Sequence, residues 1–256
     1  MKIAVLMRLV PNLSEGVDLN EDGTDVDREW TDTQANETDE QALEEALVVK
    51  EAVGATVSVI ALSDEGVERL LRSALAKGAD DAIELHLDVE VAQALPSAVT
   101  APAIAAWLKG QQFDVVLVGN QKVDDPFGGL AAHLSTALDL PVVAGAIQVK
   151  VVDGSRLRVL QEYGGGNSAW IEFSGAAVVS VQAASRPIRY VSGSKLREAM
   201  ANPAYRTVSA SKDQLQTNIP GLKLEIPQPV EGVELIADPV EAASRLVAIL
   251  EERNYI

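Results

Sequence analysis

Residues 113–138 read FDVVLVGNQKVDDPFGGLAAHLSTAL, and this stretch decides the fold of the chain. It opens with an apolar run, Phe113–Val118, which is typical of a strand buried on both faces of a sheet. A loop follows at Gly119–Phe127, and a helix is predicted from about Gly128 to Leu138. A buried strand, a loop and a helix in this order form one unit of a parallel α/β sheet.

The same alternation of strand and helix patterns fills the first two thirds of the chain. Parallel strands need a helical crossover, so the pattern predicts an α/β fold with a parallel, doubly wound, Rossmann-like sheet that carries helices on both faces. The predicted strands are Lys2–Met7, Thr56–Leu62, Asp81–Leu85, Phe113–Val118 and Pro141–Val149, and the predicted helices begin at Asp39, Ser63-Asp64, Ala98 and Gly128.

The pattern changes beyond residue 150. Three short strand-like runs are separated by glycines, which predicts hairpins that form an antiparallel edge of the sheet. These runs are Arg156–Glu162, Ser168–Phe173 and Ala176–Gln182.

After Ser185 the chain loses its periodicity until Pro239 and becomes rich in proline, as expected of an extended arm. We therefore expect an α/β domain at residues 1–184 and an arm at residues 185–256. The arm ends in a helix, because Asp238 has N-cap chemistry and Pro239 suits the first turn. An apolar stripe follows at Val240, Ala243, Val247 and Leu250. Such a helix can lie on its own domain or on another chain, and the sequence leaves both open.

The composition excludes several classes of function. The chain carries 21 Lys+Arg against 38 Asp+Glu, a net charge of −17, so we expect no nucleic acid and no anionic membrane as partner. It has no cysteine and two histidines, which excludes thiolate metal sites and disulfides. No apolar run is long enough for a membrane span, and the N-terminus enters a strand directly, so we expect a cytoplasmic protein.

Chemistry is expected where parallel strands end, because ligands of such sheets bind beyond the carboxyl ends of the strands. These ends are Met7-Arg8, Leu62-Ser63-Asp64 and Val118-Gly119-Asn120. Backbone amides at Gly128 and Gly129 could receive a phosphate at the start of a helix. Hydrogen bonds to a ribose or a base could come from Asn120, Gln121 and Asp124.

The same residues also have structural interpretations. A glycine-containing connection between strand and helix is often only a turn, and the loop matches neither a P-loop nor the G-x-G-x-x-G fingerprint. Asp124 and Asp125 are adjacent and point different ways, which disfavours a metal or acid–base pair. Ser63 lacks a nucleophile motif and is expected to cap a helix. We expect structural roles for His86 and His133.

Several stretches, taken together, carry a family resemblance. In this order and at this spacing they resemble the β subunit of electron transfer flavoproteins over almost the whole chain. The stretches are Met1–Val5 with Val10-Pro11, Asn20–Glu29, Asn36–Glu51, Leu75–Asp80, Gly119–Asp124, and Ala177–Val181 with Arg189-Tyr190.

The resemblance implies a function and a site. Such a β subunit has an adenine-nucleotide-binding α/β domain and an arm that embraces an α subunit. The α subunit holds the redox FAD, and the pair carries electrons from a dehydrogenase without covalent catalysis by the β chain. The β chain holds AMP or, in electron-bifurcating members, a second FAD. The implied nucleotide site is Leu6, Asn36, Glu37, Thr38, Asp39, Ser63, Asp64, Gly119, Asn120, Gln121, Lys122, Val123, Asp124, Asp125, Gly128, Gly129 and Leu130.

Partner contacts are expected on the arm. The resemblance places dehydrogenase recognition in the loop after Arg189-Tyr190, and the apolar stripe of the last helix is expected to touch the α subunit. The expected contact residues are Tyr190, Ser192, Gly193, Leu196, Val247 and Leu250.

Three segments depart from the family pattern. Pro126–Gly129 replaces polar side chains that would help to hold a phosphate. Ser192–Arg197 puts glycine where the recognition loop usually has its apolar anchor, and Glu198–Asn202 replaces a basic segment. A divergent member of the family would show such differences.

A second hypothesis uses the same scaffold differently. A stand-alone regulatory protein could bind an adenine nucleotide as a homodimer without flavin, because fold alone does not fix function. The extended arm and its striped helix favour the subunit hypothesis. An enzyme that adenylates or hydrolyses nucleotides would need a phosphate-gripping lysine loop, and the sequence contains none.

Overall fold

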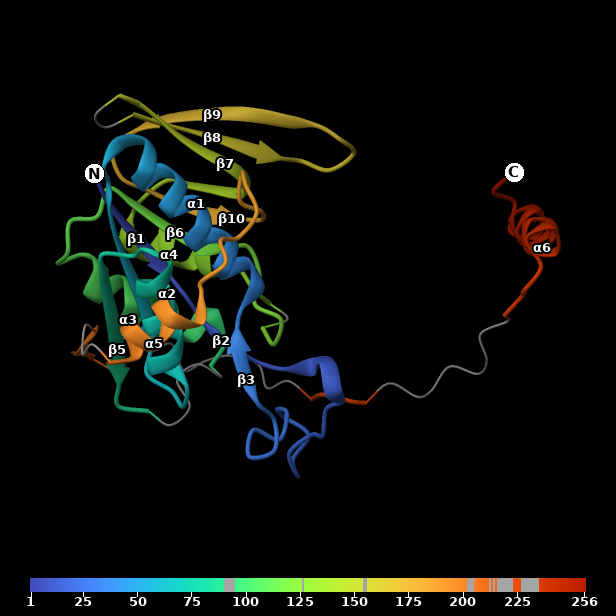
Figure 1. The fold of residues 1–256 in the computed structure, drawn as a ribbon, viewed down its shortest axis with the longest axis horizontal. Helices are drawn as coiled ribbons and strands as arrows, with labels where there is room; N and C mark the ends of the chain where they lie inside the picture. Colours follow the sequence, from blue (N-terminus) through green and yellow to red (C-terminus); the bar gives the residue numbers. More distant parts are fainter. Residues whose placement is uncertain are drawn as a thin grey trace.

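The computed structural model describes residues 1–89, 95–125, 127–153, 156–201, 205–211, 213, 215, 223–226 and 235–256. Pro126 of the segment Pro126–Gly129 and Asn202 of the segment Glu198–Asn202 lie outside these residues. Figure 1 shows an α/β body and a separate C-terminal helix.

The strands are β1 Lys2–Leu6, β2 Leu9–Pro11, β3 Thr33–Ala35, β4 Thr56–Leu62, β5 Asp81–Leu87, β6 Val115–Gly119, β7 Val142–Asp153, β8 Arg156–Glu162, β9 Ser168–Ser174, β10 Ala177–Val181 and β11 Tyr205–Ala210. The helices are η1 Leu13–Glu15, α1 Glu37–Val53, α2 Val67–Lys77, α3 Ser97–Leu108, α4 Leu130–Leu138, α5 Gly193–Ala201 and α6 Pro239–Glu252.

One large sheet organises the body, with the strand order β11-β5-β4-β1-β6-β10-β7-β8-β9 in the described part of the chain. All neighbours from β11 to β7 pair in parallel, whereas β8 and β9 extend the sheet in antiparallel fashion. β1 lies between β4 and β6, with Ile3 opposite Val57 on one side and Val115 on the other. The predicted doubly wound α/β sheet with an antiparallel edge is confirmed.

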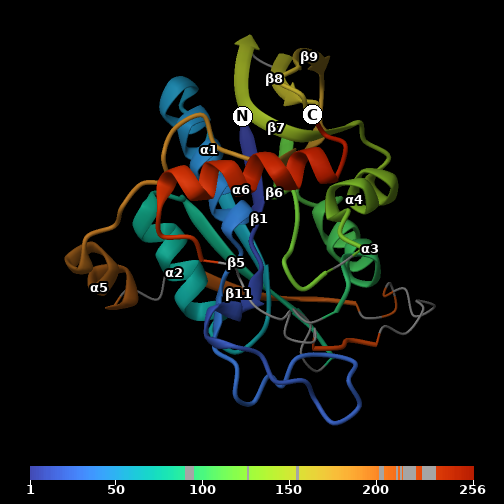
Figure 2. The ribbon, with the colours of Figure 1, turned by 90° about the vertical axis from the view of Figure 1, so that its right-hand side faces the viewer.

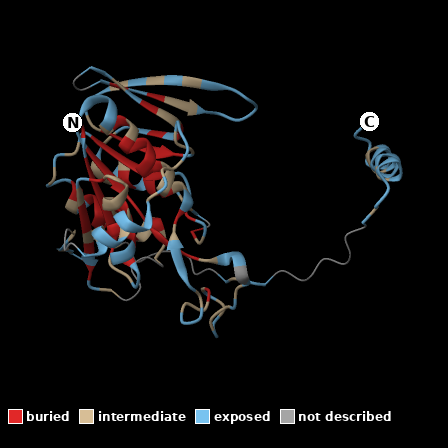
Figure 3. Cartoon of the chain, in the orientation of Figure 1, coloured by how far each residue is buried: buried red, intermediate tan, exposed pale blue. Residues whose placement is uncertain are grey.

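Two hydrophobic cores lie on the two faces of this sheet. Helices α1 and α2 cover one face, and α3 and α4 cover the other (Figure 2). Figure 3 shows the buried residues concentrated in the strands and in the inner sides of these helices. Because both faces are covered, strands such as β6 and β10 are buried at every position and read as unbroken apolar runs.

Glycines predicted the C-terminal ends of α1 and α2 correctly, whereas polar residues did not predict their N-terminal ends. Gly54 and Gly78 cap the C-termini of α1 and α2 with left-handed φ angles of 69° and 119°, as expected. Two predicted N-termini were wrong. Asn36 rather than Asp39 is the N-cap of α1, and Gly66 rather than Ser63-Asp64 is that of α2.

Two predictions about the second half of the chain were also wrong. Ala176–Gln182 was expected to form a hairpin edge, but β10 inserts in parallel between β6 and β7. Residues 205–210 were expected to lie in an aperiodic arm, but β11 pairs in parallel with β5. In both cases the partner strand is distant in sequence, so local glycine signals did not reveal it. The division at 184/185 stays a prediction.

The C-terminal helix forms as predicted. Asp238 Oδ1 accepts hydrogen bonds of 2.9 Å from the amides of Val240 and Glu241, and Pro239 stands in the first turn. None of the residues of α6 is buried, and the helix stands away from the α/β body (Figure 1). Within the described residues, no helix is long and apolar enough to cross a membrane.

Candidate functional site

The three strand ends singled out by the sequence lie side by side. β4, β1 and β6 are adjacent in the sheet and parallel, so their carboxyl ends meet at one edge. Two helix starts flank this edge: α1 follows β3 on one face, and α3 begins on the other. The candidate site is the set of side chains at this edge.

Asp39 is the centre of the site. Its side chain is fully buried, and its carboxylate accepts bonds from the Arg8 amide at 2.9 Å, from Arg8 Nη2 at 2.7 Å and from the Gly119 amide at 2.9 Å. Arg8 Nη2 also donates to the carbonyl oxygens of Gly119 and Gln121 at 3.1 and 3.3 Å. A buried carboxylate and a buried guanidinium thus neutralise each other and join the ends of β1 and β6 to helix α1.

Gly119 is required by close packing. A Cβ atom at this position would lie 2.3 Å from both Asp39 Oδ1 and Thr38 Oγ1 and 2.5 Å from the Asp39 amide nitrogen. Real Cβ atoms do not approach that closely, so only glycine lets the loop pass over the start of α1.

Asn36 and Thr38 hold the loop after β6 in place. Asn36 Nδ2 donates to the Gln121 carbonyl oxygen at 2.8 Å, and Thr38 Oγ1 donates to the same oxygen at 2.7 Å. On the other side, Ser180 Oγ of β10 donates to Asn120 Oδ1 at 2.8 Å. Of the side chains that were candidates for a ribose or base, Asn120 therefore already bonds to the protein, whereas Gln121 is held through its backbone carbonyl.

A second ion-pair chain runs through the loop. Lys122 is 2% exposed, and its ammonium lies 3.0 Å from an Asp124 oxygen. Burial lowers the pKa of Lys122, and the neighbouring Asp124 carboxylate offsets part of that shift. Arg28 then bonds Asp124 at 3.1 Å and Asp25 at 2.7 Å. The chain links the loop to the acidic segment near residue 25.

Asp125 is also buried, at 2% exposed. Its Oδ2 accepts a 2.8 Å hydrogen bond from the Ser97 amide at the start of α3, and its Oδ1 accepts a 3.2 Å bond from the Gly128 amide. The Gly128 amide also donates to the Asp125 carbonyl oxygen at 3.0 Å. Asp125 thus caps α3 from another part of the chain, a role that its sequence neighbours did not indicate.

The other predicted site residues occupy varied positions. Leu6 and Leu130 are buried, Glu37 and Val123 are exposed, and Gly129 begins α4 without a side-chain cap. The Ser63 hydroxyl is buried with no hydrogen-bond partner in the described structure, and Asp64 Oδ1 accepts from the Glu65 amide. No group of three or more His, Asp or Glu side chains in the described residues could hold a metal ion.

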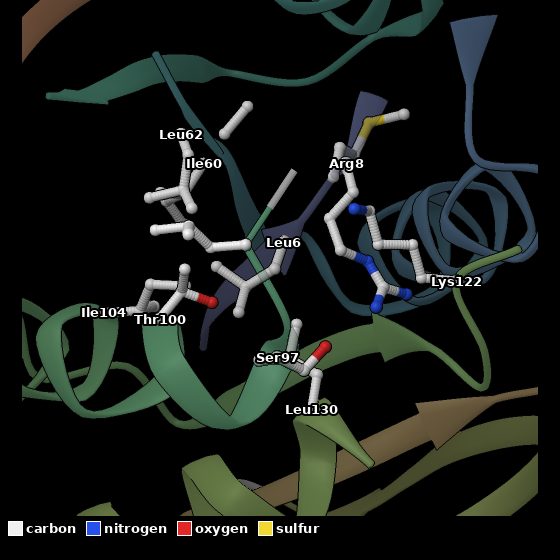
Figure 4. A pocket seen from close by; sticks show the side chains of 12 residues that line it. Leu6, Arg8, Ile60, Leu62, Ser97, Thr100, Ile104, Lys122 and Leu130 are labelled. Atoms are coloured by element: carbon white, nitrogen blue, oxygen red, sulfur yellow. The ribbon is translucent and has the colours of Figure 1, made fainter. Parts of the chain in front are cut away.

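A small cavity lies at the strand ends (Figure 4). Its apolar wall includes Leu6, Ile60 and Leu62, and Arg8 and Lys122 extend side by side along the opposite side (Figure 4). The volume open to the centre of a water-sized sphere is about 20 Å³, room for a water molecule or so. Ligand pockets usually measure roughly 300–1,000 Å³, so this cavity by itself has no room for an adenylate.

The first part of the arm is anchored by carboxylates of α1. Glu44 is buried and bonds Arg186 Nε at 2.7 Å and Arg189 Nε at 2.9 Å. Burial raises the pKa of Glu44, but the hydrogen bonds from Arg189 and Arg186 outweigh it and bring the pKa down to about 2. Glu45 accepts from the amide and the hydroxyl of Ser185 at 2.8 and 2.7 Å.

The residues expected to touch partners lie at the surface. Tyr190 is 91% exposed, Ser192 and Gly193 are exposed, and Leu196 is half-buried on α5. On α6, Val247 is exposed and Leu250 is half-buried. These placements leave the predicted contacts accessible, and the contacts themselves stay predictions.

Sequence reasoning missed the pairing of Arg8 with Asp39, the Ser97–Asp125 cap and the roles of Glu44 and Glu45. A signal existed for Arg8, because a cation directly after a buried strand needs a nearby carboxylate. The partners of Asp125 and Glu44 are 28 and more than 140 residues away, so no local pattern could have found them.

Comparisons with known proteins agree with this architecture. The family model of the electron transfer flavoprotein domain matches residues 24–213. The chain is similar to an electron transfer flavoprotein subunit beta of Methylophilus methylotrophus, with 27% identity over 98% of both chains, and to one of Clostridium acetobutylicum, with 30% identity over 84% of both. It is also 29% identical, over 60% of its length and 58% of the relative, to subunit CarD of the caffeyl-CoA reductase-Etf complex of Acetobacterium woodii. Because the matched stretch covers most of the sequence, the chain belongs to the electron transfer flavoprotein family, as a β-type subunit.

Proposed function

We propose that this chain works as one half of an electron-carrying heterodimer, with an α-type subunit that holds a redox FAD at the interface of the two chains. The observation that carries the proposal is helix α6, which is well capped but has no buried residue in the described structure. An amphipathic helix with an exposed apolar side is complete only when another surface covers that side.

In this proposal the α/β body supplies a rigid platform. The buried Arg8–Asp39 pair fastens the loop Gly119–Asp125 to helix α1, and the Glu44 and Glu45 carboxylates fasten the start of the arm to the same helix. A bound flavin supplies the electron chemistry, whereas this chain contributes surface, charge and exclusion of water around it. We assign the chain no covalent catalytic step.

The segment Tyr190–Ala201 is our candidate for contact with a dehydrogenase donor. Tyr190 projects into solvent, and α5 packs beside α2 and offers Leu196 as a half-buried apolar side chain. A relative of this chain is named as part of a complex of a reductase with an Etf. We propose that the donor of this chain's complex is a dehydrogenase that transfers electrons to flavin.

The resemblance also offered AMP or a second FAD for the strand-end site of this chain. The cavity of about 20 Å³ counts against either group in the conformation described here, so neither enters the proposal. The same observation counts against the stand-alone nucleotide-binding homodimer, whose function would depend on that pocket.

Co-expression with an α-type chain from the same genome tests the proposal. We expect a yellow one-to-one complex with a flavin absorption spectrum, and we expect the same chain cut after residue 236 to yield a folded body that no longer holds the α-type chain. The cut removes α6 and leaves the body untouched. A colourless homodimer that associates with no α-type chain would contradict the proposal.

A further inference from the structure

We propose that this chain closes its own strand-end pocket, with the Asp125 carboxylate in the place of a nucleotide phosphate and the Lys122 side chain filling the space beside it. The chain then folds, and assembles with its partner, without an adenine nucleotide. The inference concerns the pocket alone and relies on the proposed function only for the choice of the complex to be tested.

The position of the Asp125 carboxylate is the first observation. It accepts hydrogen bonds from the Ser97 amide, in the first turn of α3, and from the Gly128 amide, just before α4. Backbone amides at helix starts are the groups that bind phosphates in nucleotide-binding α/β sheets. Here a buried carboxylate of the chain already supplies the negative charge that these amides attract.

The charge balance of the site is the second observation. Three cations, Arg8, Lys122 and Arg28, lie in ion pairs with Asp39, Asp124 and Asp25 at distances of 2.7 to 3.1 Å. A phosphate that entered would add charge next to Asp124 and Asp125. Because like charges in a desolvated site repel strongly, such an entry requires that the chain's own carboxylates move out.

The space left in the pocket is the third observation. Figure 4 shows Lys122 beside Arg8 on the wall of the cavity, and Lys122 is 2% exposed, so its side chain lies within the site rather than in solvent over its mouth. About 20 Å³ remains, which holds a water molecule or so. The loop that carries Lys122 is tied down by the bonds of Arg8, Asn36 and Thr38 to the Gln121 carbonyl oxygen. Opening the pocket would break these bonds as well.

Two groups at the strand ends could still serve a nucleotide. The start of α4 has no side-chain cap, and the buried Ser63 hydroxyl has no hydrogen-bond partner within the described residues. If the pocket does bind an adenylate, these are the groups that we expect it to use. The experiment therefore counts nucleotides directly.

Nucleotides are released by denaturation from the full chain, purified alone and with its α-type partner, and are separated by chromatography. We expect one FAD per complex and no stoichiometric AMP, ADP or second FAD in either preparation. One AMP or a second flavin per complex would overturn the inference and leave the proposed function intact. A complex or chain with neither FAD nor adenylate would support the closed pocket and contradict the proposed function.

Variants of Asp125 and Lys122 test whether these two side chains close the pocket. In Asp125→Ala the Ser97 amide loses its acceptor, and we expect a lower Tm that added inorganic phosphate partly restores. In Lys122→Ala combined with Asp125→Ala, AMP at about ten times its Kd is expected to raise the Tm by roughly 2–4 °C, while the unaltered chain does not respond.

A matched control separates this response from a general effect of salt. Asp114→Ala also removes a carboxylate that accepts a backbone hydrogen bond, from the Lys2 amide at 2.6 Å, but at the opposite end of β6. We expect its Tm to be insensitive to phosphate and AMP. The inference is overturned if the unaltered chain gains as much Tm from AMP as the double variant, or if neither variant responds to phosphate or AMP.

Discussion

The strand-end site and helix α6 differ in whether their side chains find partners within the chain. At the strand ends, charged side chains are buried, and each of Arg8, Asp39, Lys122 and Asp125 has a bonding partner within the chain. In α6 the backbone is capped by Asp238, but apolar side chains such as Val240, 74% exposed, have no cover within the described structure.

The contrast separates what this chain can complete alone from what it leaves to another molecule. A buried charge that loses its partner costs several kcal/mol, and at the strand ends each of these charges has its partner within the chain. Exposed apolar surface on a helix gains stability only when it is covered. The buried charges at the strand ends are therefore paired within the chain, whereas the apolar side of α6 is left uncovered in the described structure.

The largest effect is expected from breaking the buried network. Asp39→Ala leaves the buried Arg8 guanidinium without its carboxylate and removes the acceptor of the Gly119 amide. We expect a loss of about 3–5 kcal/mol in the free energy of unfolding, as for other buried ion pairs that lose one partner. Urea unfolding followed by far-UV circular dichroism measures it, with Asp64→Ala as a control at the same sheet edge. Equal, small losses in both variants would show that Asp39 is not central.

The anchoring of the arm to α1 should depend on pH. The folded-state pKa of Glu44, about 2, lies below its ordinary value of 4.5, so its contribution is complete above pH 4.5 and is lost as the pH falls towards 2. Glu44→Gln should lower the free energy of unfolding by about 1.5–3 kcal/mol at neutral pH, the usual contribution of hydrogen bonds to a charged group.

Thermal unfolding of both proteins across the acid range measures the pH effect. We expect the difference between the unaltered chain and Glu44→Gln to be constant near neutrality and to shrink below pH 4.5. Glu51, which is exposed and shares the same two arginines, provides the control variant Glu51→Gln, for which we expect a smaller loss. A difference that does not change with pH would contradict the assigned pKa.

Acidic substitutions in the apolar stripe of α6 test whether the α-type subunit covers this side of the helix. Val247→Asp with Leu250→Asp should weaken binding to the α-type subunit by about tenfold or more, or about 1.4 kcal/mol, and should leave the Tm of the isolated chain unchanged because neither side chain is buried. Binding is measured by titration of labelled α-type chain. Arg245→Gln with Ala248→Asp makes the same change in charge on the other side of the helix, and an equal loss there would rule out a stripe-specific contact.

The smallest effect is expected from the cap of α6. Asp238→Ala removes the acceptor for the Val240 and Glu241 amides, and loss of an N-cap costs about 0.5–2 kcal/mol of local helix stability. We expect slightly lower helicity by circular dichroism and faster amide hydrogen exchange within α6 only. A change in the urea midpoint of the body would show that α6 is coupled to the body after all.

Local patterns predicted the elements well and their neighbours poorly. The run Val115–Val118, the glycines at 54 and 78, and the Asp238-Pro239 start of α6 are signals contained in a few residues, and each was read correctly. Strand β10 was misplaced because pairing with β6 and β7 is set by the packing of whole strands rather than by the short turn before it.

By itself, the sequence determined the α/β class, the three strand ends that form one edge, and a striped terminal helix with its cap. These follow from periodicity and from the backbone preferences of glycine, proline and aspartate, which act within a few residues. The tertiary structure alone decided that Asp125 caps α3, that Lys122 lines the strand-end cavity and that Glu44 holds the arm. Those contacts join residues far apart in the chain, and a buried charge takes whichever partner the fold brings within reach.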